Sequence, residues 1–285
     1  MDIVPTHRSE SYPYIDPSKA NQKGKHIFIT GASKGVGRAT ATAFARAGAS
    51  GIALAARSSL AEVEKEVLAA AEEAGHPAPK VVSYNMDVID RDVIESTAQR
   101  ADKDFSGRID ILINNAGYLE KFVPIVDSDP DEWWKTWTVN IRGVYLVTRA
   151  FLPIMLKGGD KQIVNLSSVG ALRCRPGGSG YQMTKFALLR FTEFIMSEYG
   201  TQGILAFSVH PGGIVTELVG NMPKDLHGIL TDKPDIAGDT MCFLTSQRQD
   251  WLAGRYVNCT WDMEEFFEKK NEIIERDLLK FKLLM

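Results

Sequence analysis

Features that would point to several particular classes of protein are absent from this 285-residue chain. Only three cysteines occur, far apart and without a C-x-x-C pair, so the sequence predicts neither a disulfide framework nor a zinc site. The histidines show no H-E-x-x-H or comparable spacing, so we expect no metal. Neither sign of charge dominates: 33 basic against 36 acidic residues leave a net charge of −3, which gives no electrostatic case for nucleic acid.

Long apolar runs are also lacking. No uninterrupted apolar stretch reaches about 18 residues, so the sequence predicts no membrane span. The first ten residues include Asp2, Arg8 and Glu10 and show no apolar core of a secretory signal. The sparse cysteines fit a reducing compartment, and we therefore expect a cytoplasmic protein. Hydrophobic residues at 44% and charged residues at 24% are ordinary for a globular protein.

What the chain does contain is a glycine-rich turn between a predicted strand and a predicted helix. Residues 25–29 form a β-branched and aromatic run, residues 30–37 read T-G-A-S-K-G-V-G, and residues 38–47 are rich in alanine. This is the context of a dinucleotide site, because glycines let the backbone approach a pyrophosphate and the N–H groups of the helix start face the anion. The spacing is G-x-x-x-G-x-G rather than G-x-G-x-x-G, and on its own it also fits a simple tight turn.

From this turn onward, predicted strands and helices alternate. Further strands are expected at 52–56, 80–86, 109–113, 162–166, 204–209 and 255–259. Helices are expected at 59–74, 90–105, 180–199 and 234–245, with a long helical stretch at 129–157 that is broken or kinked near Pro130 and Pro153. Continuously apolar strands separated by helices indicate a parallel sheet that is covered on both faces.

We therefore predict an α/β fold, a single-domain Rossmann-like doubly wound sheet of about seven parallel strands with helices on both faces. This domain would span residues 24–260 and bind the cofactor as well as the substrate. Residues 1–23 are expected to be an irregular arm, which Tyr12, Tyr14 and Ile15 would anchor if it is ordered. Residues 261–285 are expected to form a helical extension.

Further motifs follow the glycine turn in a fixed order. Asn114–Gly117 reads N-N-A-G after a predicted strand, Ser168 follows another strand, and Tyr181–Lys185 and Pro211–Gly213 come later. Together with the glycine turn, this ordered set is highly specific and resembles the short-chain dehydrogenase/reductase family over residues 24 to 258. The body with its two extensions looks like NADP-dependent family members of filamentous fungi that serve secondary metabolism.

The end of the second predicted strand bears on the choice of coenzyme. An acidic residue there bonds a ribose 2′-hydroxyl in dinucleotide folds, whereas an Arg accommodates a 2′-phosphate. Here Ala56 takes the acidic position, Arg57 follows it, and Lys34 adds a second cation, which favours NADP unless both are only solvated surface charges. The resemblance also implies that Asp87 and Val88 hold the adenine, with a helix-capping role for Asp87 as the alternative. The full set of implied cofactor residues is Gly31, Ser33, Lys34, Gly35, Val36, Gly37, Arg57, Ser58, Asp87, Val88, Asn114, Ala116, Gly117, Tyr181, Lys185, Pro211, Gly212, Ile214 and Thr216.

Hydride reduction of a carbonyl requires a proton donor at the developing alkoxide. Tyr181 and Lys185 are four residues apart and so lie on one helix face, where the ammonium is expected to lower the phenol pKa from about 10. The resemblance assigns the proton donation to Tyr181 and the hydrogen bond to the substrate oxygen to Ser168, with Ser167 as the alternative. It also assigns Asn140 to a water-mediated proton relay to the lysine, although an ordinary helix asparagine fits too.

The segment after the last motif is predicted to cover the active site. Residues 211–216 resemble the part of the family fold that closes over the nicotinamide, with Ile214 at the carboxamide and Thr216 at the amide or a phosphate. Residues 215–234 carry spaced apolar side chains and predict a partly helical lid over an apolar pocket. The sequence does not identify the carbonyl compound that would fit there.

We therefore expect an NADP(H)-dependent oxidoreductase that acts on a small molecule, with no nucleic-acid or membrane partner. It would reduce the ketone or aldehyde, or oxidise the alcohol, of a mid-sized and fairly apolar metabolite. Two alternatives stay open. One is a reductase of an imine or an activated double bond on the same scaffold, and the other is a non-catalytic NADP-binding regulator.

Two regions bear on assembly. The resemblance implies pairing through helices near residues 134–151 and 181–199, so we expect a homodimer or homotetramer. Beyond Trp261, spaced apolar residues predict a docked amphipathic helix, which lies either on its own subunit or on the surface used to build tetramers. These residues are Phe266, Phe267, Ile273, Ile274, Leu278 and Phe281.

Overall fold

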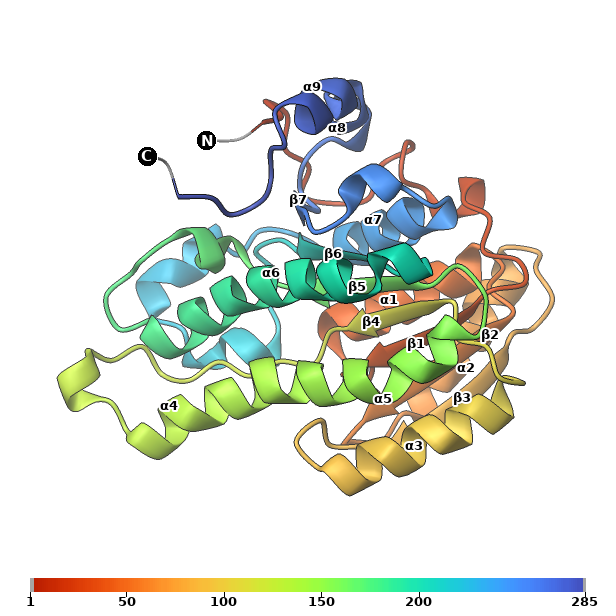
Figure 1. Cartoon of the computed structure of the whole chain (residues 1–285), viewed down its shortest axis with the longest axis horizontal. Coiled ribbons are helices and arrows are strands. Elements are labelled where there is room, and N and C mark those ends of the chain that lie inside the picture. Colours follow the sequence, from red (N-terminus) through yellow and green to blue (C-terminus); the bar gives the residue numbers. More distant parts are fainter. Residues whose placement is uncertain (1–2, 284–285) are drawn as a thin grey trace.

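A sheet of seven parallel strands forms the centre of the computed structural model, which describes residues 3–283 (Figure 1). The strand order is β3-β2-β1-β4-β5-β6-β7. The strands are β1 (His26–Thr30), β2 (Gly51–Ala56), β3 (Lys80–Asn85), β4 (Ile111–Asn114), β5 (Gln162–Leu166), β6 (Leu205–His210) and β7 (Tyr256–Asn258). The direction of the order reverses between β1 and β4, which is where doubly wound sheets bind ligands. The predicted Rossmann-like fold is thus confirmed.

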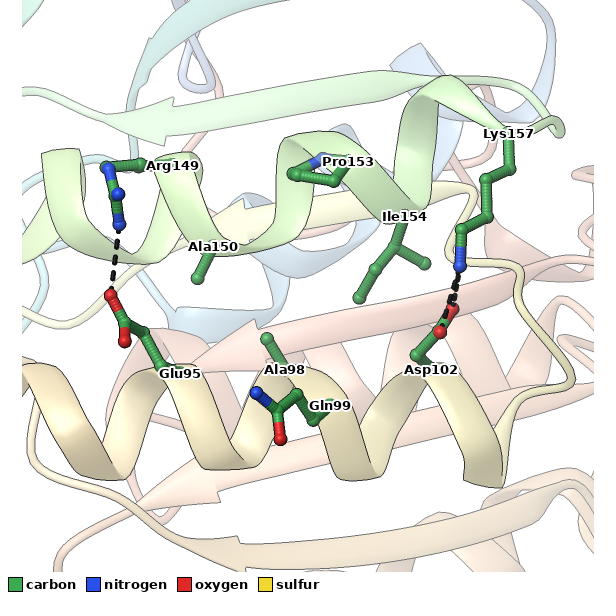
Figure 2. A pocket seen from close by; sticks show the side chains of 9 residues that line it. All are labelled: Glu95, Ala98, Gln99, Asp102, Arg149, Ala150, Pro153, Ile154 and Lys157. Carbon is green, nitrogen blue, oxygen red and sulfur yellow. Dashed lines mark hydrogen bonds and ion pairs between the residues drawn. The ribbon is translucent and has the colours of Figure 1, made fainter.

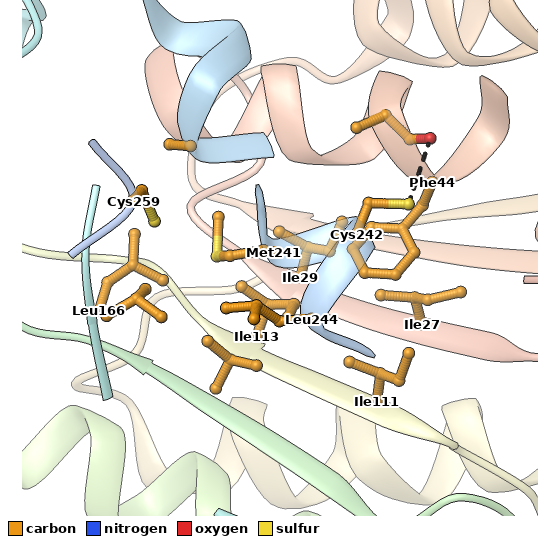
Figure 3. Close-up of a cluster of buried hydrophobic side chains, with 14 of the residues drawn as sticks. Ile27, Ile29, Phe44, Ile111, Ile113, Leu166, Met241, Cys242, Leu244 and Cys259 are labelled. Atoms are coloured by element: carbon orange, nitrogen blue, oxygen red, sulfur yellow. Dashed lines mark hydrogen bonds between the residues drawn. The ribbon is translucent and has the colours of Figure 1, made fainter. Parts of the chain in front are cut away.

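Helices cover both faces of the sheet. One layer holds α1 (Gly35–Arg46), α2 (Ala61–Glu73) and α7 (Pro234–Ser246); the other holds α3 (Arg91–Asp104), α5 (Val144–Leu156) and α6 (Ser179–Tyr199). Because side chains alternate along a strand, each central strand supplies both cores. Ile27 and Ile29 of β1 belong to the core that contains Phe44 and Met241 (Figure 3), whereas Phe28 belongs to the core on the other face with Phe151.

The long helical stretch is interrupted at a different place from the one predicted. Pro130 does not kink it but begins α4 (Pro130–Trp137), where a missing N–H costs nothing, and Asp129 caps this helix. The irregular part is a π-helical segment, Thr138–Gly143, which leads directly into α5. Pro153 is accommodated inside α5 on its exposed side, where water can reach the carbonyl freed by the missing N–H.

The same stretch, Pro130–Leu156, is the one helix in the described chain that is long and apolar enough to cross a membrane. Its most apolar window has a mean hydropathy of 1.3, and 56% of that window is buried inside the protein. Core helices of soluble proteins pass the same test, so this is weak evidence for a membrane span.

The N-terminal arm lies against the body of the protein. Val4 and Ile15 are fully buried, and the ring of Tyr14 packs on Phe243 with 5.4 Å between ring centres. The hydroxyl of Tyr12 accepts a hydrogen bond from the backbone N–H of Met263. The arm therefore contacts both α7 and the C-terminal tail.

The C-terminal tail is not the single helix that the sequence predicted. It forms two short helices, α8 (Met263–Glu268) and α9 (Lys270–Glu275), and then an irregular segment. Phe266 and Ile273 are fully buried, but Phe281 lies beyond the helices and is 43% exposed. Phe266 packs against Trp251 and Trp261, and the N–H of Tyr256 on β7 donates to the carbonyl of Leu279 in the later segment. The tail docks on its own subunit.

Candidate active site

The segments singled out in the sequence meet at one end of the sheet, where the strands finish. In a parallel sheet all carboxyl ends lie on the same side, and each predicted motif follows the end of a strand. The glycine turn follows β1, Arg57 follows β2, Asp87 follows β3, N-N-A-G begins at the end of β4, Ser168 follows β5, and Pro211 follows β6.

The glycine turn is built so that only glycine fits. Gly31 and Gly35 have φ values of 66° and 53°, in the left-handed region that side chains disfavour. A Cβ atom on Gly37 would lie 2.3 Å from the carbonyl oxygen of Gly31, and one on Gly31 would lie 2.9 Å from Cα of Ala116. The turn therefore packs directly against the N-N-A-G segment, against the backbone of Ala116 and the amide of Asn115.

The start of α1 is suited to an anion. Lys34 is its N-cap residue, and no described side chain caps the free N–H groups of the first turn. Val36 and Gly37 lie in that turn, whose positive dipole end adds to the charge of Lys34. These residues fit the pyrophosphate of a dinucleotide cofactor.

Of the residues expected around a 2′-phosphate, Ser33 and Ser58 are in contact. The hydroxyl of Ser58 donates to that of Ser33 at 2.9 Å, which joins the end of β2 to the glycine turn. Both cations have carboxylate partners: Lys34 pairs with Glu217, and Arg57 lies 3.8 Å from Asp87. The side chain of Arg57 remains 75% exposed and is accessible to a ligand.

Val88, Asn114 and Ala116 lie together beside Thr30, the residue before the glycine turn. The amide of Asn114 donates to Thr148 and Asn165, so this residue also joins β4 to α5 and β5. Gly117 follows, and a Cβ atom there would lie 3.7 Å from Nζ of Lys185. These residues thus lie between the glycine turn and the predicted catalytic lysine.

The segment after β6 reaches over the glycine turn. A Cβ atom on Gly35 would lie 3.0 Å from the methyl group of Thr216. Gly212, which follows Pro211, has a φ of 114°, and Ile214 is buried. Two short 3₁₀ helices follow, Glu217–Asn221 and Lys224–Ile229. They lie within the segment predicted to be a partly helical lid, and its role as a lid stays a prediction.

Tyr181 and Ser168 face each other. Tyr181 lies in the first turn of α6, and the hydroxyl of Ser168 lies close enough to its phenol to stabilise the phenolate form. Ser168 also caps the short helix Val169–Leu172 by accepting from the N–H of Gly170. Ser167 points the other way, since its hydroxyl donates to the carbonyl of Lys185 in the interior. Of the two serines, only Ser168 is placed beside the phenol.

The predicted lowering of the tyrosine pKa is not seen. Burial raises the pKa of Tyr181 to about 12, the hydrogen bond from Ser168 opposes this rise, and the carboxylate of Glu120 adds to it. Burial also lowers the pKa of Lys185 to about 8. The expectation considered only the attraction between phenolate and ammonium; the structure adds the cost of burying either charge.

Asn140 has a clear structural role. It lies in the π-helical segment, fully buried, and its amide exchanges two hydrogen bonds of 2.8 Å with the backbone of Tyr118. It also donates to the hydroxyl of Thr184 on α6. Its amide thus holds the loop after β4 against α6, and the water-mediated relay stays a prediction.

Three residues of this site escaped the sequence analysis. Asn115 donates from its amide to the carbonyls of Thr30 and Gly31 and so holds the glycine turn. Glu120 is only 5% exposed, and its carboxylate accepts from the N–H of Tyr181. Asn221 in the lid donates to a carbonyl of the same loop, that of Leu119. None belongs to a spacing pattern that marks a role; Asn115 lies within N-N-A-G, but its contacts depend on the fold.

Other parts of the surface show no comparable chemistry. An open groove of about 500 Å³ lies between α3 and α5, and the ion pairs Glu95–Arg149 and Asp102–Lys157 bridge it (Figure 2). It is remote from the strand ends that carry the motifs. Within residues 3–283, no group of three or more His, Cys, Asp or Glu side chains is placed to hold a metal ion.

Comparison with known proteins agrees with this geometry. The family model for short chain dehydrogenase matches residues 25–227. Short chain dehydrogenase mpl6 of Monascus purpureus is 50% identical over 283 residues, covering 99% of this chain and 96% of that protein. Short chain dehydrogenase pigC of Monascus ruber is 45% identical over 287 residues, covering 99% and 94%.

Solved structures show the same fold. A short chain dehydrogenase from Salmonella enterica matches with a TM-score of 0.72 at 24% identity, over 87% of this chain and 99% of that one. A 3-ketoacyl-(acyl-carrier-protein) reductase from Brucella melitensis complexed with NADH matches with a TM-score of 0.72 at 27% identity, over 84% and 97%. The family model matches most of the chain, and the Monascus proteins match nearly all of it. The chain therefore belongs to the short-chain dehydrogenase family.

Proposed function

We propose that this protein is an NADP(H)-dependent oxidoreductase that interconverts a ketone or aldehyde and the corresponding alcohol. The observation that carries the proposal is the placement of the Ser168 hydroxyl beside the phenol of Tyr181, at the same end of the sheet as the glycine turn. A phenol and a hydroxyl that face each other are suited to a carbonyl oxygen, because one can donate a proton while the other donates a hydrogen bond.

In this proposal the nicotinamide cofactor, when bound, supplies a hydride to the carbonyl carbon or accepts one from the alcohol. Tyr181 gives its phenolic proton to the oxygen as negative charge develops there, and Ser168 holds that oxygen by a hydrogen bond. Lys185 is buried on the same face of α6 and stabilises the phenolate left behind. The glycine turn and the start of α1 would hold the pyrophosphate, with Lys34 and Arg57 at the 2′-phosphate.

The state of the phenol favours the reductive direction at neutral pH. With its pKa raised to about 12 by burial, Tyr181 carries its proton and acts as an acid rather than a base. The similarity to a reductase of 3-ketoacyl groups supports carbonyl reduction, although that structure is described with NADH. The preference for NADP rests on Lys34, Ala56 and Arg57 of this chain.

The substrate is proposed to be a mid-sized and fairly apolar small molecule. The lid carries exposed apolar side chains, Val215 at 71% and Ile229 at 54%, as a cover for an apolar ligand would. The similarity to proteins of Monascus and Aspergillus species supports a role in fungal secondary metabolism. A cytoplasmic location completes the proposal, on the basis of the sparse and unpaired cysteines.

The test is a panel of ketones, quinones and polyketide-like carbonyls incubated with NADPH and followed at the nicotinamide absorbance band. Oxidation of NADPH by at least one member, with the alcohol identified as product, is expected. Tight NADPH binding with no turnover would instead favour a cofactor-binding regulator. Turnover of imines or activated alkenes alone would favour the other reductase chemistry on this scaffold.

A further inference from the structure

Glu120 is a buried carboxylate that no sequence motif marks. It lies in the loop between β4 and α4 and is 5% exposed. One oxygen accepts from the backbone N–H of Tyr181 at 2.8 Å, and the other accepts from the hydroxyl of Thr136 at 2.7 Å. Burial of a carboxylate is costly unless its oxygens are paired, so this arrangement needs both donors.

The carboxylate lies at the positive end of a long helix. Tyr181 is the third residue of α6, a helix of 21 residues, and its N–H is among those that the helix itself leaves free. Glu120 therefore acts from a distant loop as a capping carboxylate does, with the helix dipole favouring its charge. The approach is so close that a Cβ atom on Gly180 would lie 2.5 Å from the carboxylate, and only glycine fits there.

Glu120 also joins three elements around Tyr181, the proposed proton donor. It connects the β4–α4 loop to α4 through Thr136 and to α6 through Tyr181. The contacts of Asn140 hold the same loop two residues earlier, at Tyr118, and reach α6 at Thr184. The start of α6 is thereby held at Tyr181 and, one turn later, at Thr184. These contacts fix the position of Tyr181, whose phenol faces Ser168.

We propose that Glu120 is a positioning residue of the active site: its carboxylate fixes the turn of α6 that carries Tyr181 and keeps the phenol in its proton-bearing form. The first part follows from the hydrogen bond to the Tyr181 backbone. The second follows from the sign of the charge, because a nearby carboxylate disfavours the phenolate. The role of this residue in turnover rests on the proposed function; its effect on the phenol does not.

The charges around Tyr181 come from three elements. From its own helix, Nζ of Lys185 lies 5.6 Å from the ring centre and favours the phenolate. From the loop after β4, Glu120 disfavours it, and from the loop after β5, the hydroxyl of Ser168 stabilises it by a hydrogen bond. Glu120 is thus the negative group that opposes Lys185, and burial acts in the same direction as Glu120.

The test uses Glu120→Gln, whose amide keeps an oxygen for the Tyr181 N–H but carries no charge. Its matched control is Glu132→Gln, a half-exposed carboxylate on α4 that bonds Tyr118 rather than Tyr181. Both are made with 3-fluorotyrosine at position 181, whose ionisation is followed by fluorine NMR in the folded protein without substrate. We expect the pKa at position 181 to fall in Glu120→Gln and to stay unchanged in Glu132→Gln.

If the protein turns over a carbonyl, the high-pH limb of kcat/KM should move to lower pH by the same amount, with NADPH affinity unchanged. A merely structural role would lower the melting temperature without moving either titration, and that result would overturn the proposal. Because the NMR titration needs no turnover, an inactive protein with a shifted pKa would refute the proposed function while leaving the inference on Glu120 intact.

Discussion

The ammonium group of Lys185 lies 5.6 Å from the centre of the Tyr181 ring, one turn further along the same helix. It donates a 2.7 Å hydrogen bond to the carbonyl of Leu166, at the end of β5. Lys185 therefore links helix α6 directly to strand β5. The lysine is thus held in place by the strand, while the phenol of Tyr181 lies beside Ser168.

Tyr181→Phe tests the acid directly. The change removes only the phenolic hydroxyl, so NADPH binding and folding should remain close to wild type. Turnover should fall by about 10²–10⁴-fold, the usual contribution of a positioned proton donor. Steady-state rates and NADPH fluorescence titration measure the two effects separately. Tyr145→Phe, at a half-exposed tyrosine on α5, is the control; activity of Tyr181→Phe within a few-fold of this control would remove tyrosine from the mechanism.

Much of the fold was predictable because its signals are local. Apolar runs and the glycine turn depend on neighbouring residues, and they led to seven strands and to a site at their carboxyl ends. The family resemblance likewise pointed to Ser168, the serine that lies beside the phenol. These features survive because parallel topology brings successive strand ends together whatever the details of the loops.

What could not be predicted depends on contacts between distant segments. Glu120 reaches Tyr181 across 61 positions of sequence, and its neighbours in the chain show no pattern that marks it. The raised pKa of Tyr181 follows from burial, which the pair Tyr181 and Lys185 alone does not reveal. The tail packs through contacts of Phe266 with Trp251 and Trp261, and Trp251 lies outside the tail, so the spacing of apolar residues within the tail does not reveal them.

Arg57→Ala tests the choice of coenzyme. Loss of one charged hydrogen bond to a 2′-phosphate should cost about 1.5–3 kcal/mol, which is roughly a 10- to 150-fold loss of NADPH affinity. NADH binding should hardly change, since it lacks that phosphate. Both affinities are measured by fluorescence titration, with Arg248→Ala, at an arginine after α7 paired with Asp250, as a control. A wild type that already prefers NADH would show the NADP assignment to be wrong.

Asp239 should make stability depend on pH beneath the N-terminal arm. Its carboxylate accepts from Ser11, lies 3.6 Å from Arg46, and is 2% exposed; Asp235 and Asp16 add negative charge. Burial raises its pKa to about 6 from 3.8. The folded state then binds more protons than the unfolded state between these pH values, so this contribution to stability is lost as pH rises through that window.

Asp239→Asn removes this titration. From pH 4 to pH 7 the wild type should lose about 2–3 kcal/mol of unfolding free energy that the variant keeps, since one pKa unit corresponds to about 1.4 kcal/mol. Urea denaturation at both pH values measures the difference. An equal gap between variant and wild type at the two pH values would contradict the raised pKa.

The tail covers the outer edge of the sheet. The N–H of Tyr256 on β7 donates to the carbonyl of Leu279 at 2.9 Å, and Arg255 lies 3.0 Å from Asp277. Phe281 then packs edge-on against Phe186 of α6, with 4.3 Å between ring centres. An edge strand that is closed by its own chain cannot pair with a second subunit there. We therefore expect assembly through α4, α5 and α6, whose exposed apolar residues include Trp134, Tyr145 and Phe194.

Removing residues 276–285 tests this role of the tail while keeping α8 and α9, which bury Phe266 and Ile273. Loss of the contacts to β7 should lower the unfolding free energy by about 1–3 kcal/mol, because a buried backbone donor is left without its partner. The freed edge should also allow dimers to pair, so light scattering should show a mass twice that of the full chain.

Phe281→Ala serves as the control, since it loses one ring contact but keeps the backbone hydrogen bond on β7. A full chain that is a 31.5 kDa monomer would contradict the expected oligomer. A truncated protein of unchanged mass and unchanged melting temperature would show that the tail neither stabilises the edge nor limits assembly.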